Sequence, residues 1–235
     1  MEQFIREEMA LGSAAMEKLA NSHVAVFGIG GVGSYTAEAL ARAGIGRLTL
    51  IDNDTVGITN LNRQLCALHS TIGMYKAEVM AKRALDINPA CTVAALPLLY
   101  TDADKEKFFT QRYDYIADCI DLVSCKLSLI QTAMGRNIPI ISALGTGNKL
   151  DPTQFQVTDI SKTANCGLAR VIRKELRYRN IKHHKVVFSP EEPLTPIGGE
   201  APPPGRRSTP ASVSWVPSVA GLVLAGAIIQ DLIEK

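Results

Sequence analysis

The sequence predicts an α/β fold built on a doubly wound, mostly parallel sheet. Short apolar runs alternate with amphipathic stretches through the first half of the chain, which is typical of strands and helices in such a sheet. A Gly-rich turn directly follows the first apolar run, and an aspartate ends the second. A turn and an acidic residue in these positions are features of nucleotide-binding βαβ units. We therefore expect a Rossmann-like fold.

Each element of the first half has a boundary that the residues suggest. The helix after the second strand ends before Asn88 and Pro89, because a proline disfavours helical backbone at the residue before it. Alternation of this kind forces parallel pairing with right-handed crossovers. The predicted strands are residues 23–27, 47–51, 91–96, 113–118 and 138–142, and the predicted helices are 32–42, about 74–86, a short one near Lys105, and 123–136.

The pattern changes after Gly147, where we expect a C-terminal extension on the substrate side. Residues 154–160 indicate an extended strand, and residues 168–178 indicate a helix with one apolar and one basic face. Residues from about 189 to 210 are rich in Pro and Gly and predict a mobile loop before a final helix. We predict a nucleotide-binding core over 1–150, including an N-terminal segment, and an extension over 151–235 in the same globular unit.

The composition limits the class of protein. Apolar residues make up 46% and charged residues 20% of 235 positions, which excludes a chain that is disordered by default. A net charge of +2 is too small to indicate a partner. The five cysteines form no C-x-x-C pair, so we expect no structural zinc and a reducing environment.

The two ends of the chain bear on its location. The opening MEQFIREEMALG mixes acidic and apolar residues and does not have the basic cluster and apolar run of a secretory signal. The apolar stretch over 215–229 contains Pro217, Gly221 and Gly226 and is shorter than the roughly 20 residues that a bilayer needs. We expect a buried final helix, no membrane span and a cytoplasmic protein.

The Gly-rich turn is the first feature that points to chemistry. Glycines permit a tight turn and let backbone amides approach phosphate, while the start of a helix favours anions. A carboxylate at the end of the second strand can accept hydrogen bonds from ribose hydroxyls. The residues concerned are Gly28, Gly30, Gly31, Gly33 and Asp52. These features describe an NAD-dependent oxidoreductase equally well.

The stretch from Asp52 to Gln64, with Lys76 after it, separates these two classes of enzyme. A dehydrogenase needs none of these polar residues, whereas an enzyme that makes an acyl adenylate must neutralise charge on the α-phosphate as pyrophosphate leaves. Arg63 and Lys76 are suited to that task, and Asp54 and Asp121 are suited to ribose, metal or substrate positioning. Each could instead be an ordinary surface residue, but together they indicate an adenylating enzyme.

At these residues the chain resembles the ThiF, MoeB and HesA branch of the ubiquitin-activating-enzyme-like superfamily. The shared pattern is G-x-G-G-x-G, then D-x-D-x-V-x-x-x-N-x-x-R-Q, then a lysine and a later aspartate. The resemblance implies that Gly28, Gly30, Gly31 and Gly33 flank ATP and that Asp52 binds ribose. It implies phosphate contacts for Asn62, Arg63, Gln64 and Lys76, and a magnesium and catalytic role for Asp121.

The opening segment also resembles that family, in which an arginine of the N-terminal segment reaches the ATP site of the partner subunit. Arg6 is the candidate for this role, and the resemblance therefore implies a homodimer. Gln3 occupies a position where many relatives have another arginine.

The second half resembles members of the family that modify tRNA, through DPTQ at 151–154, Lys162, Thr163, CGLA at 166–169 and VVFS at 186–189. The implied reaction adenylates the carboxylate of a threonylcarbamoyl group on tRNA adenosine, and the modification's own ureido group then closes a ring. An attacking group already on the substrate has a high effective concentration, so no external nucleophile is needed. Cys166 could be a nucleophile, but a buried or helix-capping thiol is the favoured interpretation.

Three alternatives remain open. The nearest is adenylation of the C-terminal carboxylate of a ubiquitin-like sulfur carrier, with a sulfur-donor or sulfur-carrier protein as partner; missing zinc cysteines disfavour it. An NAD-dependent oxidoreductase and a nonenzymatic nucleotide-binding adaptor are the others. RNA binding has separate support from basic residues, which a solvated surface would equally explain: Arg170, Arg173, Lys174, Arg177, Arg179, Lys182, His183, His184, Lys185, Arg206 and Arg207.

Overall fold

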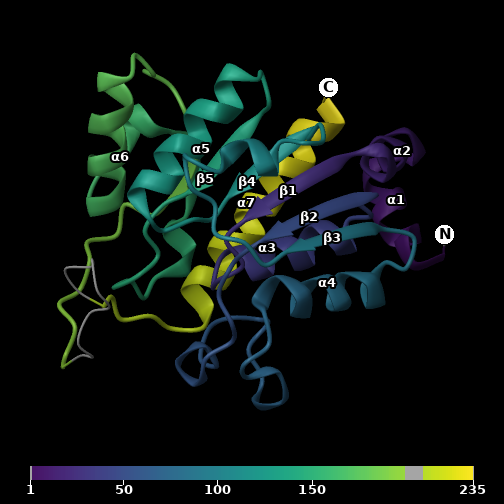
Figure 1. The fold of residues 1–235 in the computed structure, drawn as a ribbon, viewed down its shortest axis with the longest axis horizontal. Helices are drawn as coiled ribbons and strands as arrows, with labels where there is room; N and C mark the ends of the chain where they lie inside the picture. Colours follow the sequence, from purple (N-terminus) through teal and green to yellow (C-terminus); the bar gives the residue numbers. More distant parts are fainter. Residues whose placement is uncertain (1, 199–208, 235) are drawn as a thin grey trace.

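A computed structural model describes residues 2–198 and 209–234 (Figure 1). Its centre is a seven-stranded sheet with the order β3-β2-β1-β4-β5-β7-β6. All neighbouring strands pair in parallel except β6 and β7, which are antiparallel. The strands are β1 (His23–Phe27), β2 (Arg47–Ile51), β3 (Thr92–Leu96), β4 (Tyr115–Asp118), β5 (Ile140–Ala143), β6 (Gln156–Asp159) and β7 (Lys185–Phe188).

Helices cover both faces of the sheet. The α-helices are α1 (Ile5–Leu11), α2 (Ser13–Asn21), α3 (Gly33–Arg42), α4 (Lys76–Ile87), α5 (Val123–Gly135), α6 (Gly167–Tyr178) and α7 (Trp215–Glu234). Short 3-10 helices are η1 (Glu2–Phe4), η2 (Ile58–Asn60), η3 (His69–Thr71), η4 (Lys105–Phe108), η5 (Pro152–Gln154) and η6 (Ile160–Lys162). The predicted α/β class is confirmed: the sheet is Rossmann-like, doubly wound and mostly parallel.

The core consists of two layers because side chains alternate across the strands. Val24 and Val26 of β1 belong to one cluster, with residues of α3, α4 and α7. Ala25 and Phe27 point to the other face and belong to a second cluster, with residues of α5 and α6. The predicted strand 23–27 has all five residues buried, as a central parallel strand should.

Strand β7 and helices α1 and α2 were not predicted, and most of the other differences between prediction and structure lie at element ends. The helix predicted from about residue 74 begins at Lys76, because Tyr75 has an extended backbone and Thr55 and Tyr75 form an isolated bridge. The short helix predicted near Lys105 is a 3-10 helix. Residues 199–208, which include part of the predicted late loop together with Arg206 and Arg207, lie outside the described residues. The boundary at residue 150 stays a prediction.

The final helix connects the C-terminal part to the first half of the chain. By length and composition alone α7 could cross a membrane, yet half of its apolar window is buried in the protein. Gly221 lies so close to α3 that an added Cβ would be 2.4 Å from the carbonyl oxygen of Val32. Pro217 approaches the Gly-rich turn, with its Cβ 3.1 Å from the Cβ position of Gly31. The predicted buried helix therefore borders the turn.

A buried polar network joins three strands and α5. The ammonium of Lys126 lies 2.7 Å from the carboxylate of Asp118, and both side chains are fully buried. Lys126 also donates to the carbonyl oxygens of Asp118 and Ala143. Ser142 donates to Asp118 at 2.5 Å and lies 2.7 Å from Nε2 of His184. A buried charge needs an ion-pair partner and hydrogen bonds of this kind. The burial of Lys126 and Asp118 therefore explains why these polar groups lie together.

The position of His184 corrects one sequence-based interpretation. We expected this histidine at the surface among phosphate-binding residues, but its side chain is 3% exposed. Burial, followed by the charge of Lys126, lowers the pKa of His184 to about 3. His184 directly precedes the buried apolar strand β7 and lies in the core with it. The basic residues around it in the sequence had suggested a position at the surface.

The first prediction concerns this histidine and the pH dependence of stability. The pKa of His184 is lower in the folded protein than the ordinary value of 6.5, so its stabilising contribution is present above that value and is lost as the pH falls toward 3. One group contributes a slope of at most about 1.4 kcal/mol per pH unit. We expect His184→Gln to flatten the dependence of the unfolding free energy on pH between 6 and 4, measured by urea denaturation.

The control for this experiment is His69→Gln, because His69 is exposed. The control should keep the steep fall of the wild-type protein. An equally steep fall in His184→Gln would show that other groups cause the acid sensitivity.

Candidate functional site

The Gly-rich turn lies between β1 and α3 and is packed against the backbone that follows β4. Gly28 has a φ of +88°, and an added Cβ would be 2.8 Å from the carbonyl oxygen of Cys119. A Cβ at Gly33 would be 1.8 Å from the carbonyl oxygen of Gly28. Both positions therefore require glycine. The turn therefore lies at the carboxyl edge of the sheet, next to the backbone amides at the start of α3. Anions bind at this place in such folds.

Asp52 supports this turn from the end of β2. One carboxylate oxygen accepts the backbone N–H of Ile29 at 2.6 Å, and the other accepts that of Asp54 at 2.8 Å. Burial raises the pKa of Asp52, although these two amide bonds act in the opposite direction. A carboxylate oxygen can accept a second hydrogen bond, so the predicted ribose contact remains compatible with this arrangement.

The segment after Asp52 returns to lie beside the glycines. Arg63 has its Cγ 3.7 Å from the Cβ position of Gly31, and Nε2 of Gln64 is 3.9 Å from that of Gly30. The guanidinium of Arg63 donates to the carbonyl oxygen of Thr59 and to Oδ1 of Asn62. The structure thus brings Arg63 and Gln64 to the turn, and their contacts with phosphate stay a prediction.

Lys76 and Asp54 form an ion pair at the same edge of the sheet. The ammonium lies 2.9 Å from the carboxylate of Asp54, and the exposed fractions of the two side chains are 6% and 61%. Lys76 opens α4, and its burial makes loss of a charge partner costly. A bound phosphate could take the place of the Asp54 carboxylate, or contact Lys76 beside it. The charge of Lys76 would stay compensated in either case.

Asp121 follows β4 in the loop that leads into α5. The backbone N–H of Cys119 donates to the carbonyl oxygen of Phe27 at 2.8 Å, which extends the pairing of β1 and β4 past the strand ends. Asp121 is exposed and lies two residues from the contact with Gly28. Among residues 2–198 and 209–234, no three histidine, cysteine or acidic residues form a metal-binding cluster.

Arg6 lies away from the other predicted site residues. Phe4, two residues before it, has its ring 3.6 Å from the Cβ position of Gly44, and the end of α2 packs on Gly46. Gly44 and Gly46 precede β2, whereas Asp52 follows it. Figure 1 accordingly shows α1 and α2 at the end of the sheet opposite the Gly-rich turn. Within one chain, Arg6 is not assembled with the site.

A segment at the start of the extension, which was not predicted from the sequence, lies over the site. Asn148, with a φ of +59°, donates its N–H to the carbonyl oxygen of Ala211, and its Oδ1 accepts the N–H of Ala211. Its own carbonyl oxygen accepts the N–H of Leu194. Asn62 completes the connection by donating to the carbonyl oxygen of Ser212 at 2.9 Å. A glycine-containing turn after β5, at the carboxyl edge, was the signal that could have identified it.

Cys66 and Cys119 pack against the phosphate turn, but no cysteine is arranged as a nucleophile. Sγ of Cys166 caps α6 by accepting the N–H of Ala169 at 3.4 Å, which agrees with the helix-capping interpretation. Burial raises the pKa of Cys66 to about 11 and that of Cys119 to about 12. A thiol with a raised pKa is a poor nucleophile near neutral pH.

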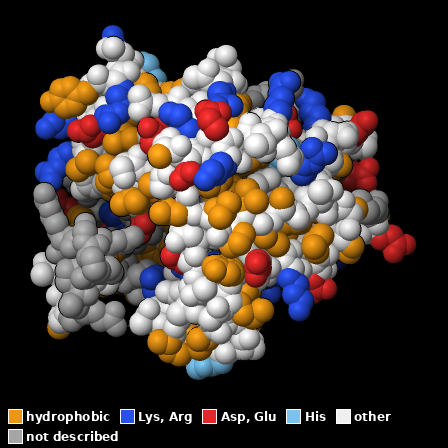
Figure 2. Space-filling view, in the orientation of Figure 1, with side chains coloured by type: hydrophobic (Ala, Val, Ile, Leu, Met, Phe, Trp, Pro, Cys, Tyr) orange, Lys and Arg blue, Asp and Glu red, His pale blue; other side chains and the backbone are white. Residues whose placement is uncertain are grey.

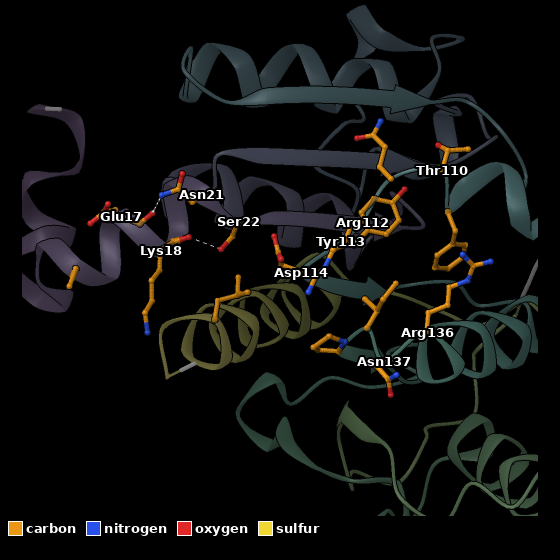
Figure 3. A pocket seen from close by; sticks show the side chains of 16 residues that line it. Glu17, Lys18, Asn21, Ser22, Thr110, Arg112, Tyr113, Asp114, Arg136 and Asn137 are labelled. Carbon is orange, nitrogen blue, oxygen red and sulfur yellow. Dashed lines mark hydrogen bonds between the residues drawn. The ribbon is translucent and has the colours of Figure 1, made fainter.

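A further cavity lies elsewhere in the molecule. It has a volume of 1120 Å³ and opens at the amino edge of the sheet, where Lys18, Arg112, Asp114 and Arg136 are among its lining residues (Figure 3). Its charged side chains are of both signs, and Arg136 is paired with Glu106 at 2.6 Å. The phosphate-binding geometry is at the opposite edge, so the candidate site is not this cavity.

Together these contacts define a nucleotide-binding α/β protein with a phosphate turn, a buried lysine and a nearby carboxylate. Residues 4–235 match the ThiF family, and the chain belongs to that family. The resemblance inferred from the glycine and D-x-D-x-V patterns is therefore confirmed.

Several relatives of this chain are named tRNA threonylcarbamoyladenosine dehydratase. The chain is 46% identical to the tRNA threonylcarbamoyladenosine dehydratase of Bacillus subtilis, with 100% of this chain and 96% of the relative covered. It is 45% identical to that of Escherichia coli over 71% of this chain and 62% of the relative. The crystal structure of E. coli TcdA with AMP superposes with a TM-score of 0.91 at 36% identity, covering 100% of this chain and 95% of that one. E. coli TcdA has also been solved with ATP, at a TM-score of 0.90.

The second prediction tests the Gly-rich turn. Gly33→Ala should abolish measurable ATP binding, because the new methyl group would overlap the carbonyl oxygen of Gly28 and displace the turn. Isothermal titration calorimetry with ATP measures the effect. Gly135→Ala is the matched control, since a Cβ there meets no atom within 4 Å. Retained ATP affinity in Gly33→Ala would contradict a nucleotide site at this turn.

Proposed function

We propose that this chain is an ATP-dependent enzyme that adenylates the threonylcarbamoyl carboxylate on a tRNA adenosine and then catalyses ring closure with loss of AMP. The observation that carries the proposal is the phosphate turn with Arg63, Gln64 and Lys76 beside it. Support comes from the B. subtilis relative, matched over the full length of this chain, and from the E. coli TcdA structures with AMP and ATP.

In the first step a carboxylate oxygen of the substrate attacks the α-phosphorus of ATP, and the bond from that phosphorus to the bridging oxygen breaks to release pyrophosphate. Backbone amides of the turn bind the phosphates. Negative charge accumulates on the phosphoryl oxygens. Lys76 and Arg63 neutralise this charge from fixed positions, and the low exposure of Lys76 strengthens its effect.

Magnesium would be held by Asp121 together with phosphate oxygens. Mg²⁺ usually binds proteins through one or two carboxylates plus substrate phosphates, not through a cage of protein ligands. A single exposed carboxylate in the loop beside Gly28 fits this mode. When bound, the ion would neutralise charge on the departing pyrophosphate.

In the second step the ureido group of the modification attacks the activated carbonyl carbon, a proton is released, and AMP departs with one former carboxylate oxygen. The nucleophile is part of the substrate, so the enzyme has to position it and exclude water. The burial of Cys66, the raised pKa of Cys119 and the capping position of Cys166 accord with a step that uses no enzyme thiol.

Adenylation of a sulfur-carrier protein is not favoured. The relatives named adenylyltransferase and sulfurtransferase UBA4 are 32% identical over 70% of this chain, which covers 37% of their length. The B. subtilis dehydratase is matched with higher identity over the whole of this chain. A sulfur-carrier or sulfur-donor partner therefore ranks below modified tRNA, and we propose a cytoplasmic location, where tRNA is modified.

Arg6 completes the site in a homodimer under this proposal. It lies at the amino edge of its own sheet, whereas the phosphate turn lies at the carboxyl edge. The α1 helix also exposes Ile5 and Met9, at 58% and 82%. Apolar side chains exposed next to an arginine are suited to contact a second subunit.

The third prediction tests reaction type and substrate together. Purified protein with MgATP and threonylcarbamoyl-modified tRNA should release pyrophosphate, and the modified nucleoside should lose the mass of one water. Lys76→Ala should lower kcat/KM by about 100-fold, while the exposed Lys82→Ala should not. Pyrophosphate release with a sulfur-carrier protein and none with modified tRNA would reject the proposed substrate.

The fourth prediction tests the contribution of Arg6 across subunits. Arg6→Ala and Lys76→Ala should each have very low activity, but equal mixing under exchange should restore about a quarter of wild-type activity, because half of the dimers are mixed and each has one intact site. If Arg6 acted within its own chain, every mixed dimer would carry two damaged sites. No recovery, with exchange verified by mass spectrometry, would exclude the role across subunits.

A further inference from the structure

The structure reduces the basic residues of the extension to a small set without charge partners. Arg179 is paired with Glu175, and Lys185 with Asp231. His184 is buried. Of the other described cations in the extension, four lie together on one helix, and we call them the α6 stripe: Arg170, Arg173, Lys174 and Arg177.

The α6 stripe has the geometry of a continuous binding surface. Its positions are spaced i, i+3, i+4 and i+7, so they share one face of α6 over about 10 Å. The four side chains and Tyr178 line a shallow pocket of 410 Å³. Tyr178 is 72% exposed, and the ammonium of Lys174 lies 5.8 Å from its ring centre. Figure 2 shows Lys and Arg side chains gathered over α6, at the left of the molecule.

The charges of the stripe are not neutralised by the protein. In the part of the chain that the structure describes, none of the four cations forms an ion pair. Arg173 instead donates to the carbonyl oxygen of Thr163. By contrast, Arg42 and Arg83 share the carboxylate of Glu38. Like charges three or four residues apart on a helix repel one another, so an anionic ligand would relieve that repulsion.

The stripe is connected to the edge where the nucleotide site lies. Sγ of Cys166, the N-cap of α6, is 3.4 Å from the Cβ position of Gly145, just after β5. The same segment continues to Asn148, which holds the chain near Asn62 through Ala211 and Ser212. A polymer entering the site at this edge could extend along α6.

We propose that the α6 stripe binds the ribose-phosphate backbone of the tRNA substrate and that Tyr178 stacks against an unpaired base or a ribose. This inference rests on the proposed function for the identity of the ligand. Unpaired cations in a row match successive phosphates, and an exposed aromatic ring beside them is a feature of RNA-binding surfaces. A flat anionic membrane would use the cations but not this groove.

The test compares two double variants that remove the same charge. Lys174→Ala/Arg177→Ala removes half of the stripe, and both side chains are exposed, so their loss should leave the fold intact. The matched control is Arg47→Ala/Lys82→Ala, which removes two exposed cations from β2 and α4. Fluorescence anisotropy with labelled tRNA transcript, across a series of salt concentrations, measures affinity without requiring turnover.

The stripe variant should bind tRNA about tenfold more weakly, and its slope of log affinity against log salt should be shallower by about 1.5. Its KM for modified tRNA should rise with little change in kcat, because the contact is made equally before and during the reaction. ATP affinity should be unchanged. The control variant should match the wild type in all of these measurements.

Equal losses in the two variants, or unchanged tRNA affinity in the stripe variant, would overturn the proposal. Binding of the stripe to phosphatidylserine vesicles but not to tRNA would also overturn it and assign the surface to a membrane. If wild-type protein binds tRNA through the stripe but does not turn over modified tRNA, the proposed function fails while the RNA surface stands.

Discussion

The close contact between the Gly28–Gly33 turn and the backbone of Cys119 is the constraint on which the site depends. Because Gly28 and Gly33 have no side chains, the end of β1 approaches the end of β4 more closely than any other residue pair would permit. This approach puts the phosphate turn beside the loop that carries Asp121. Asp52 then holds the turn from β2 through the N–H of Ile29. The phosphate turn and the charged side chains around it thus lie together at the carboxyl edge of the sheet.

The buried ion pair of Lys126 and Asp118 supports that edge from inside. Lys126 donates to the carbonyl oxygens of Asp118 and Ala143, at the ends of β4 and β5. It therefore holds together the strands from which the Asp121 loop and the Asn148 segment depart. Removing one partner would leave a buried charge, which is strongly destabilising. Catalytic groups on short loops keep their positions because the strand ends beneath them are fixed.

The sequence was sufficient to predict the phosphate turn and every strand of the sheet except β7, because these depend on local patterns. Strands β1 and β2 match their predicted bounds, and Gly28, Gly33 and Asp52 are where the βαβ pattern puts them. The Asn148 contacts with Ala211 and Leu194 could not be predicted, since they join residues more than forty positions apart. The burial of His184 was missed because charge composition does not show which side of a strand faces the core.

The central claim is that a substrate carboxylate becomes an acyl adenylate, and oxygen-isotope transfer tests it most directly. Modified tRNA carrying heavy oxygen in the threonylcarbamoyl carboxylate is incubated with MgATP and the protein, and the products are analysed by mass spectrometry. The account predicts AMP that contains one heavy oxygen, together with unlabelled pyrophosphate. Heavy oxygen in inorganic phosphate, with ADP as the nucleotide product, would show activation by phosphorylation and contradict the account.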